Sequence, residues 1–295
     1  MGMFMKRKIL GLLAIGILTV AGATVALADR LDQMVSPITS PTTFEDPRSL
    51  SELRLIYVRH NFEDDFVTLG GNVQIYALQA RFAINDRLSI IATKDGYVDF
   101  NPDATLPKDE GWANIGGGVK YAFYKDDEAG QIASAALRYE FASGDEEVLQ
   151  GNGDGLIHPS VSAAFALDDT VTLMASTDAR IAVDGDDSSF WHFDLHLDKR
   201  FETSAGSFYP LAELNVIQVI DGGRRLPITD EGVEFFDLGA SGAEDKTIVI
   251  GGIGLRYRAC DSVDLGVAFQ VPLTDGSGSR AIENRLTADV IWHFA

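Results

Sequence analysis

The sequence is poor in cysteine, in basic residues and in enzyme motifs. Cys260 is its only cysteine, which excludes a disulfide within the chain. Its 24 lysine and arginine residues are outnumbered by 44 aspartate and glutamate residues, which argues against nucleic acid, whose phosphates need basic partners. The sequence has no G-x-S-x-G, H-E-x-x-H, P-loop or dinucleotide fingerprint. We therefore expect no enzyme activity, no cofactor, no metal site and no nucleic-acid partner.

Long apolar runs are also missing, except near the N-terminus. Three basic residues at positions 6–8 precede an apolar stretch over residues 9–25, and an Ala-Leu-Ala cleavage site ends at Ala28. This order is typical of a secretory signal, so residues 1–28 are predicted to be removed on export. An uncleaved anchor is the alternative, because the stretch approaches the roughly 20 residues that span a bilayer.

Residues 29–50 have a different character from the rest of the exported chain. Pro37, Pro41 and Pro47 lie among serines and threonines without sustained periodicity, which predicts an extended periplasmic N-terminal segment. The remainder is either soluble or a membrane barrel, since only helices and closed barrels satisfy their backbone groups in lipid. Strand patterning from residue 51 onward decides between the two.

Residues 51–295 alternate apolar and polar side chains with a period of two, as strands with two different faces do. The segments exceed the roughly 5 to 6 residues of a globular strand and match the roughly 9 to 11 that cross a membrane. Short connections alternate with long ones. We therefore predict an all-β fold, a transmembrane antiparallel β-barrel of about 12 strands with short periplasmic turns and long extracellular loops. The predicted strands are 53–60, 72–84, 87–97, 112–124, 131–142, 157–167, 170–182, 189–201, 207–219, 247–258, 262–272 and 284–294.

Aromatic residues mark the periplasmic end of the predicted barrel. Every strand that runs toward the periplasm ends on one, as expected for the aromatic girdle of such barrels. These residues are Phe82, Phe123, Phe165, Phe201, Tyr257 and Phe294. The last strand, with Trp292 and Phe294 on its apolar face, resembles the recognition signal of outer-membrane barrel assembly, although Ala295 follows it. The expected partners are outer-membrane lipid, lipopolysaccharide and, during biogenesis, the barrel-assembly machinery.

Charged residues and histidines occupy the opposite face of the strands, which we predict to line the lumen. They can line a pore or form ion pairs that plug the barrel, because about twelve strands lie between a filled barrel and an open porin. His192 and His196 could chelate zinc with a third ligand, but a polar ladder on the wall is the favoured interpretation. The candidate lumen residues are Lys120, Arg138, Glu140, His192, Asp194, His196, Glu213, Arg256, Arg258, Arg285 and Asp289.

Two further features bear on function. The connection over residues 220–246 contains many apolar residues, so we expect it to fold inward as a constriction or to lie against the rim. His158 and Ser160 share a strand face, a faint similarity to outer-membrane phospholipase A. Pro159 intervenes and the rest of that motif is absent, so we do not expect lipid hydrolysis.

A family resemblance spans about fifty residues from Ile115 onward. It rests on IGGGVKYAF (115–123), AALRYEF (135–141), Ser143-Gly144-Asp145 and Gly151-Asn152-Gly153. Together these resemble the outer-membrane transporter-like barrels grouped with the MetA pathway of phenol degradation. Members usually show Thr-Gly-Asp where this chain has Ser143-Gly144-Asp145. The resemblance implies an uptake channel for small molecules, aromatic ones among them, and supplies no catalytic residues.

The leading hypothesis is a passive outer-membrane channel for small solutes, including hydrophobic or aromatic ones. The alternative is a non-conducting barrel of the outer membrane, structural or surface-interacting, whose lumen is closed by ion pairs. A third hypothesis, a secreted soluble β-protein, predicts partition into the aqueous fraction without detergent.

Overall fold

The computed structural model describes residues 30–275 and 280–294, and all but one of its regular elements are β-strands. The exception is the short 3-10 helix η1 (Glu146–Val148). Among these residues, no helix is long and apolar enough to cross a membrane. The predicted signal peptide, residues 1–28, lies outside the described part. The strands are β1 (Glu52–Asn61), β2 (Gly71–Ala83), β3 (Leu88–Lys94), β4 (Tyr97–Pro102), β5 (Asp109–Trp112), β6 (Ile115–Asp126), β7 (Gln131–Phe141), β8 (Leu156–Ala166), β9 (Val171–Ala182), β10 (Ser189–Lys199), β11 (Phe201–Thr203), β12 (Gly206–Asp221), β13 (Thr247–Cys260), β14 (Val263–Pro272) and β15 (Asn284–His293).

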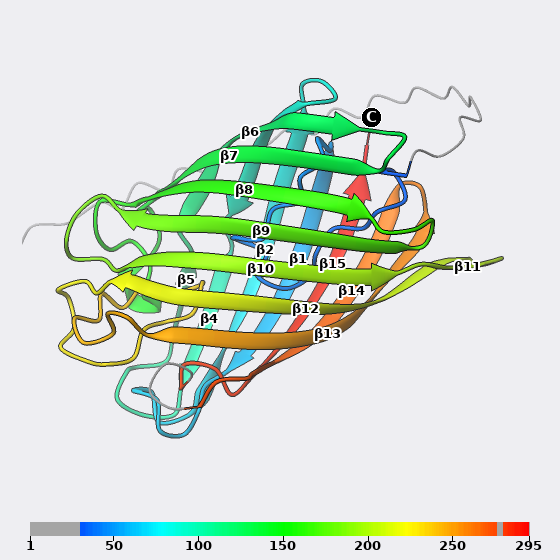
Figure 1. Cartoon of the computed structure of the whole chain (residues 1–295). Helices are drawn as coiled ribbons and strands as arrows, with labels where there is room; N and C mark the ends of the chain where they lie inside the picture. Colours follow the sequence, from blue (N-terminus) through cyan, green and yellow to red (C-terminus); the bar gives the residue numbers. More distant parts are fainter. Residues whose placement is uncertain (1–29, 276–279, 295) are drawn as a thin grey trace, which may run out of the picture.

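The strands form one antiparallel sheet that closes on itself (Figure 1). β1 pairs with β2 on one side and with the last strand, β15, on the other, which completes the ring. Three pairs of consecutive strands, β3–β4, β5–β6 and β10–β11, each continue one strand of the wall across an interruption. The wall therefore has twelve strands, and the predicted all-β antiparallel barrel is confirmed.

The outer face of the barrel is apolar on strands all around the ring. Leu55 on β1, Val161 on β8 and Ile253 on β13 are exposed, the last to 71%. The predicted aromatic ends, such as Phe82 and Phe123, are also exposed near the short turns. An apolar band around a closed sheet is suited to lipid rather than water.

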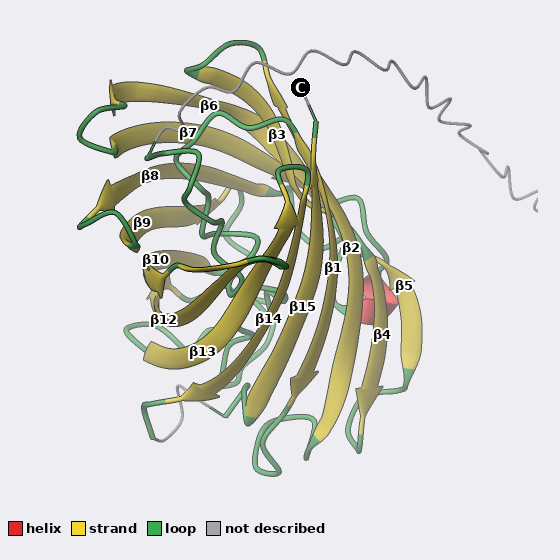
Figure 2. Cartoon of the chain, turned by 90° about the vertical axis from the view of Figure 1, so that its right-hand side faces the viewer, coloured by secondary structure: helices red, strands yellow, loops and turns green. Residues whose placement is uncertain are grey.

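The interior of the barrel is filled from both ends. We call the end with the short connections the turn end and the opposite end the loop end; in outer-membrane barrels these face the periplasm and the outside, respectively. At the turn end, residues 31–48 run inside the barrel, and nearly all of them are buried (Figures 1 and 2). At the loop end, the connection between β12 and β13 folds inward, and its Phe235 and Phe236 join inward-facing strand residues in one hydrophobic cluster. This inward fold is one of the two arrangements expected for that connection.

The position of the N-terminal segment corrects the sequence-based prediction. Residues 29–50 were expected to extend into the periplasm ahead of the barrel, but the described residues 30–50 enter the barrel. The physical reason is that the inner wall offers hydrogen-bond donors and charges to this segment, whose backbone has no strand partner of its own.

Candidate functional site

Inward-facing arginines hold the N-terminal segment (residues 31–48) by its backbone carbonyls. Arg54 of β1 donates to the Pro37 carbonyl (2.8 Å), and Arg256 of β13 donates to the Ser36 carbonyl (2.9 Å). An extended segment outside a sheet leaves its carbonyls unpaired, and a buried carbonyl needs a donor. The arginines supply these donors from opposite sides of β15, so the segment becomes part of the barrel interior.

Acidic residues provide a second set of contacts to this segment. Glu45 pairs with Arg81 of β2 (2.6 Å) and with Lys120 of β6 (2.7 Å). Burial by itself raises the pKa of Glu45, but the two cations outweigh it and lower the pKa to about 2. On the other side of the segment, Glu213 of β12 accepts a hydrogen bond from the Ile38 N–H (2.9 Å). The N-terminal segment is therefore held in a fixed position at the turn end. It occupies the route along the barrel axis toward that end, which we call the axial path.

The predicted lumen residues lie on the inner face of the wall, where all but the partly buried Arg258 are buried. Many of them are committed to partners. Asp289 pairs with both Arg256 (2.8 Å) and Arg54, and Arg285 pairs with Glu234 of the inward-folded connection (2.8 Å). That these side chains line the path of a solute remains a prediction.

Other predicted lumen residues also have partners on the inner wall. Arg138 pairs with Asp178, and Glu140 pairs with Lys94. Asp194 accepts a hydrogen bond from Asn215 (2.8 Å). The N-terminal segment and the paired charges around it fill the part of the lumen toward the turn end, which we call the polar half.

The two histidines that suggested a zinc site have different surroundings. His196 contacts Glu213 through Nδ1 (2.6 Å) and Asp198 through Nε2 (2.9 Å), so both of its ring nitrogens are engaged. Neither ring nitrogen of His192 has a hydrogen-bond partner within the described ranges. Those ranges contain no group of three or more histidine, cysteine or acidic residues arranged to hold a metal ion.

The predicted assembly signal lies on the outer face of the last strand. Trp292 is exposed, and its ring centroid lies 5.9 Å from that of Phe294. Recognition of these residues by the assembly machinery stays a prediction.

The wall of the barrel is interrupted between β3 and β4. β2 pairs with β3 as far as Ala80 and with β4 from Tyr76 onward, and the β3–β4 side carries one extra residue between these points. The N–H of Leu78 faces this interruption and donates to Asp95 Oδ1 (2.9 Å) instead of to a strand. Gly96 adopts a φ of +132°, and a Cβ there would lie 2.8 Å from the Tyr76 carbonyl oxygen, so this bend requires glycine.

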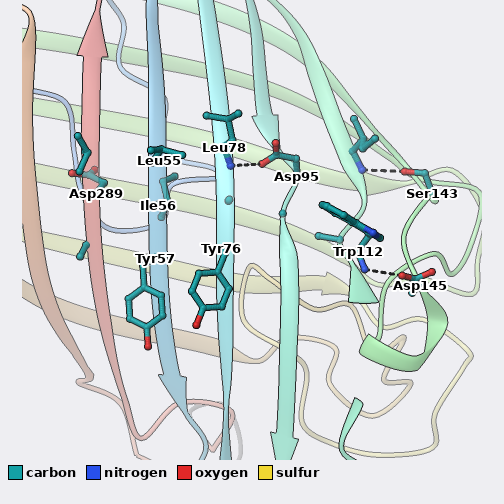
Figure 3. Close-up of a pocket in the computed structure, with 16 residues that line it drawn as sticks. Leu55, Ile56, Tyr57, Tyr76, Leu78, Asp95, Trp112, Ser143, Asp145 and Asp289 are labelled. Carbon is teal, nitrogen blue, oxygen red and sulfur yellow. Dashed lines mark hydrogen bonds between the residues drawn. The ribbon is translucent and has the colours of Figure 1, made fainter. Parts of the chain in front are cut away.

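An apolar groove of about 880 Å³ lies on the outer face of the barrel over this interruption (Figure 3). Tyr57, Tyr76 and Trp112 present aromatic rings to it, and Trp112 is 64% exposed. Asp145, which follows β7, accepts a hydrogen bond from the Trp112 N–H (2.7 Å). This contact holds the end of β5 in place at the break between β5 and β6. The groove faces the lipid side of the wall, since these aromatic side chains alternate with buried ones.

A cavity of about 30 Å³ lies directly behind the groove, inside the barrel. Val98 of β4 and Phe235 of the inward-folded connection form part of its wall. Only a thin layer of side chains separates this cavity from the groove, because four residues line both. These are Ile56, Ala77, Asp95 and Ala113. We call these four residues the wall barrier.

This interruption lies inside a strand predicted to be continuous, although the sequence contains a signal for it. Asp95-Gly96 lies inside the predicted strand 87–97, and Asp-Gly is a turn signal in the middle of a strand pattern. The second break, at Ala113-Asn114 inside the predicted strand 112–124, carries a weaker signal, since only asparagine is a turn former there.

Comparisons with known proteins bear on the fold. No protein-family profile matches the chain, and no curated relative matches it. The crystal structure of the COG4313 outer membrane channel from Pseudomonas putida F1 is similar, with a TM-score of 0.58 at 15% sequence identity over 88% of this chain and 100% of that one. A NanC porin structure gives a TM-score of 0.48 at 10% identity, over 83% of this chain and 99% of the other. The chain therefore has the fold of an outer-membrane channel.

Proposed function

We propose that this chain is a passive outer-membrane channel that admits small apolar solutes at the loop end and releases them sideways through the wall barrier. The observation that carries the proposal is the thin layer of four residues between the inner cavity and the apolar outer groove. The N-terminal segment occupies the alternative, axial path toward the turn end. The apolar outer band and the channel fold support placement in the outer membrane.

The physical chemistry of an apolar solute favours a sideways path. Such a solute loses the hydrophobic gain if it must leave the barrel into water, whereas release into lipid keeps it in an apolar medium. The wall barrier includes two alanines, Ala77 and Ala113, so little side-chain volume has to move. The extra residue opposite β2 also leaves fewer ladder hydrogen bonds to break at this height.

The second candidate function is the non-conducting structural barrel. It is supported by the paired charges that fill the polar half, such as Asp289 between Arg54 and Arg256. Both candidates predict low ion conductance through the full chain. They differ in whether an apolar solute crosses faster when the protein is present.

Filling the wall barrier separates these candidates. Ala113→Phe adds a ring at the barrier, while Ala175→Phe adds the same ring on the outward face of β9 as a matched control. The measurement is the rate at which N-phenyl-1-naphthylamine becomes fluorescent in the envelope of intact cells that express each variant. Conductance of the purified proteins is recorded in planar bilayers in parallel.

The proposal predicts that the wild-type chain and Ala175→Phe accelerate probe uptake and that Ala113→Phe slows it by about tenfold, the effect of roughly 1.4 kcal/mol on a barrier. Conductance should be the same in all three. Equal uptake by cells with and without the protein would favour the structural barrel. Uptake that Ala113→Phe leaves unchanged would refute the sideways path.

A further inference from the structure

A second, larger interior cavity lies at the loop end of the barrel. Its volume is about 390 Å³, within the range of small-molecule sites. The inward-folded connection between β12 and β13 forms one side of it. The β1–β2, β4–β5 and β7–β8 connections form most of the other side, together with the strand residues His60 and Phe100. Thr105 and Leu226 belong to its lining and are exposed, so the cavity reaches solvent at this end. We call it the loop-end pocket.

Four phenylalanines form the apolar part of the loop-end pocket. The ring of Phe62 lies 5.4 Å from that of Phe66 and 6.0 Å from that of Phe100, and the rings of Phe100 and Phe236 are 6.0 Å apart. All four are buried. These spacings are those of stacked and edge-to-face aromatic pairs, so a further ring entering the pocket meets favourable faces and edges.

The charges of the lining select against an anion. Arg225 is already paired with Asp187, and Glu146 and Asp237 are acidic groups. His60 is neutral in this hydrogen-bond arrangement, because its Nδ1 accepts from Arg285 Nε (3.1 Å). A carboxylate in the pocket would therefore find no uncommitted cation among the described lining residues, and burying an unpaired charge is strongly unfavourable.

The loop-end pocket lies next to the path proposed above. Phe100 of the pocket and Val98 of the cavity behind the wall barrier are successive inward-facing residues of β4. Phe236 and Phe235 connect the same two cavities on the facing side. A ligand that leaves the pocket along β4 thus arrives at the wall barrier.

We propose that the loop-end pocket is a binding site for one neutral aromatic molecule, and that it excludes an aromatic carboxylate of the same size. The inference rests on the proposed function for where the ligand goes next. Binding itself does not require an open wall.

The test is calorimetric titration of the purified full chain, held in amphipol, with 2-naphthol, 2-naphthoate and naphthalene. These probes share one ring system and differ in the polar group. One molecule of naphthol or naphthalene should bind per chain, and naphthoate should bind at least about tenfold more weakly than naphthol. Naphthoate binding as tight as naphthol binding would overturn the proposal.

Three variants assign the binding to this pocket. Ile228→Trp fills it from the rim and Val233→Trp from the buried side, whereas Val267→Trp adds the same side chain on the outward face of β14. The first two should abolish naphthol binding and the third should retain it, each checked for folding by heat-modifiable gel mobility. Binding that survives in a folded pocket-filled variant would refute the site.

One further variant separates the pocket from the proposed function. Ala113→Phe, which fills the wall barrier, should leave naphthol binding intact. If naphthol binds but Ala113→Phe does not slow probe uptake in cells, the sideways path fails and the pocket stands.

Discussion

The two halves of the barrel interior come from the same alternating strands but have opposite chemistry. On β12, the middle inward positions carry Glu213 and Asn215, and those nearer the loop end carry Ile217 and Val219. β2 shows the same partition, with Arg81 toward the turn end and Val73 and Ile75 toward the loop end. On these two strands the inner face is therefore divided along the barrel axis, whereas on β7 and β9 buried charges, Glu140 and Arg180, extend to the loop end.

The two kinds of lining suit different tasks, because the polar lining fixes the N-terminal segment and the apolar lining lets a solute move. The polar half fixes one object, the N-terminal segment, through directional contacts with arginines and carboxylates. Buried ion pairs recover little net stability once their desolvation is counted, but they specify position closely. The apolar half encloses the loop-end pocket, where hydrophobic contacts are non-directional and allow a solute to move.

Removal of the N-terminal segment should have the largest effect among the tests of this comparison between the polar and apolar halves. Deletion of residues 31–48 should open the polar half, because these residues are buried within it. We expect stable ion conductance in planar bilayers where the full chain conducts little. Conductance equal to that of the full chain, in a deletion variant that still shows heat-modifiable mobility, would mean that the segment does not close the axial path.

Breaking the charge network within the polar half should have the next largest effect. Asp289→Ala leaves Arg54 and Arg256 buried without their carboxylate, which should lower the free energy of unfolding by about 3–5 kcal/mol. Urea unfolding measured by tryptophan fluorescence checks this, with Asp261→Ala in an exposed turn as the control. A loss no greater than that of the control would show that the pairing is not structurally important.

The pH dependence of the loop end should be intermediate in size. Burial, and then the neighbouring Asp237 charge, raise the pKa of Asp187 from 3.8 to about 7, partly offset by Arg225. Because the folded-state pKa of Asp187 lies above the unfolded value, folding favours the protonated carboxyl. Its contribution to the free energy of unfolding is complete below pH 3.8 and is lost as the pH rises through about 7. The connection around Phe236 should become several-fold more sensitive to protease from pH 5 to pH 8.

The control for this pH effect is Asp187→Asn, which cannot ionise. It should flatten the dependence, after correction for the activity of the protease at each pH. A dependence as steep as in the wild-type chain would place the titrating group elsewhere.

The smallest effect is expected at an exposed pair outside both halves. Arg30 and Asp169 lie 2.7 Å apart with side chains that are 43% and 80% exposed. Surface pairs of this kind contribute less than about 1 kcal/mol. Arg30→Ala should leave the urea midpoint nearly unchanged, and a large loss would show that the start of the N-terminal segment contributes more than its exposure suggests.

The strand pattern could be predicted from the sequence because it is local. A period of two places Leu286 and Val290 outside and Arg285 and Asp289 inside, whatever the rest of the chain does. The exposed positions of Phe82 and its counterparts at the turn end follow from the same local order.

The contents of the barrel could not be predicted in this way. Contacts of the N-terminal segment join residues such as Ser36 and Arg256, which are 220 positions apart, and no local period encodes that pairing. The axial division was also missed, since alternation distinguishes the faces of a strand but not its two ends. The wall interruption is the exception, because Asp95-Gly96 gave a local signal within a strand.

The central claim, that solutes pass from the apolar half through the wall, is tested most directly by photolabelling from inside the barrel. A small apolar diazirine is added to cells that express the full chain, and labelled residues are mapped by mass spectrometry. Only inward-facing positions are informative, because lipid delivers the probe to the outer face. The account predicts labels on Val98 and Phe235 and none on Leu31 or Met34 of the N-terminal segment. Labels on Leu31 and Met34 without labels on Val98 and Phe235 would show an axial path and contradict it.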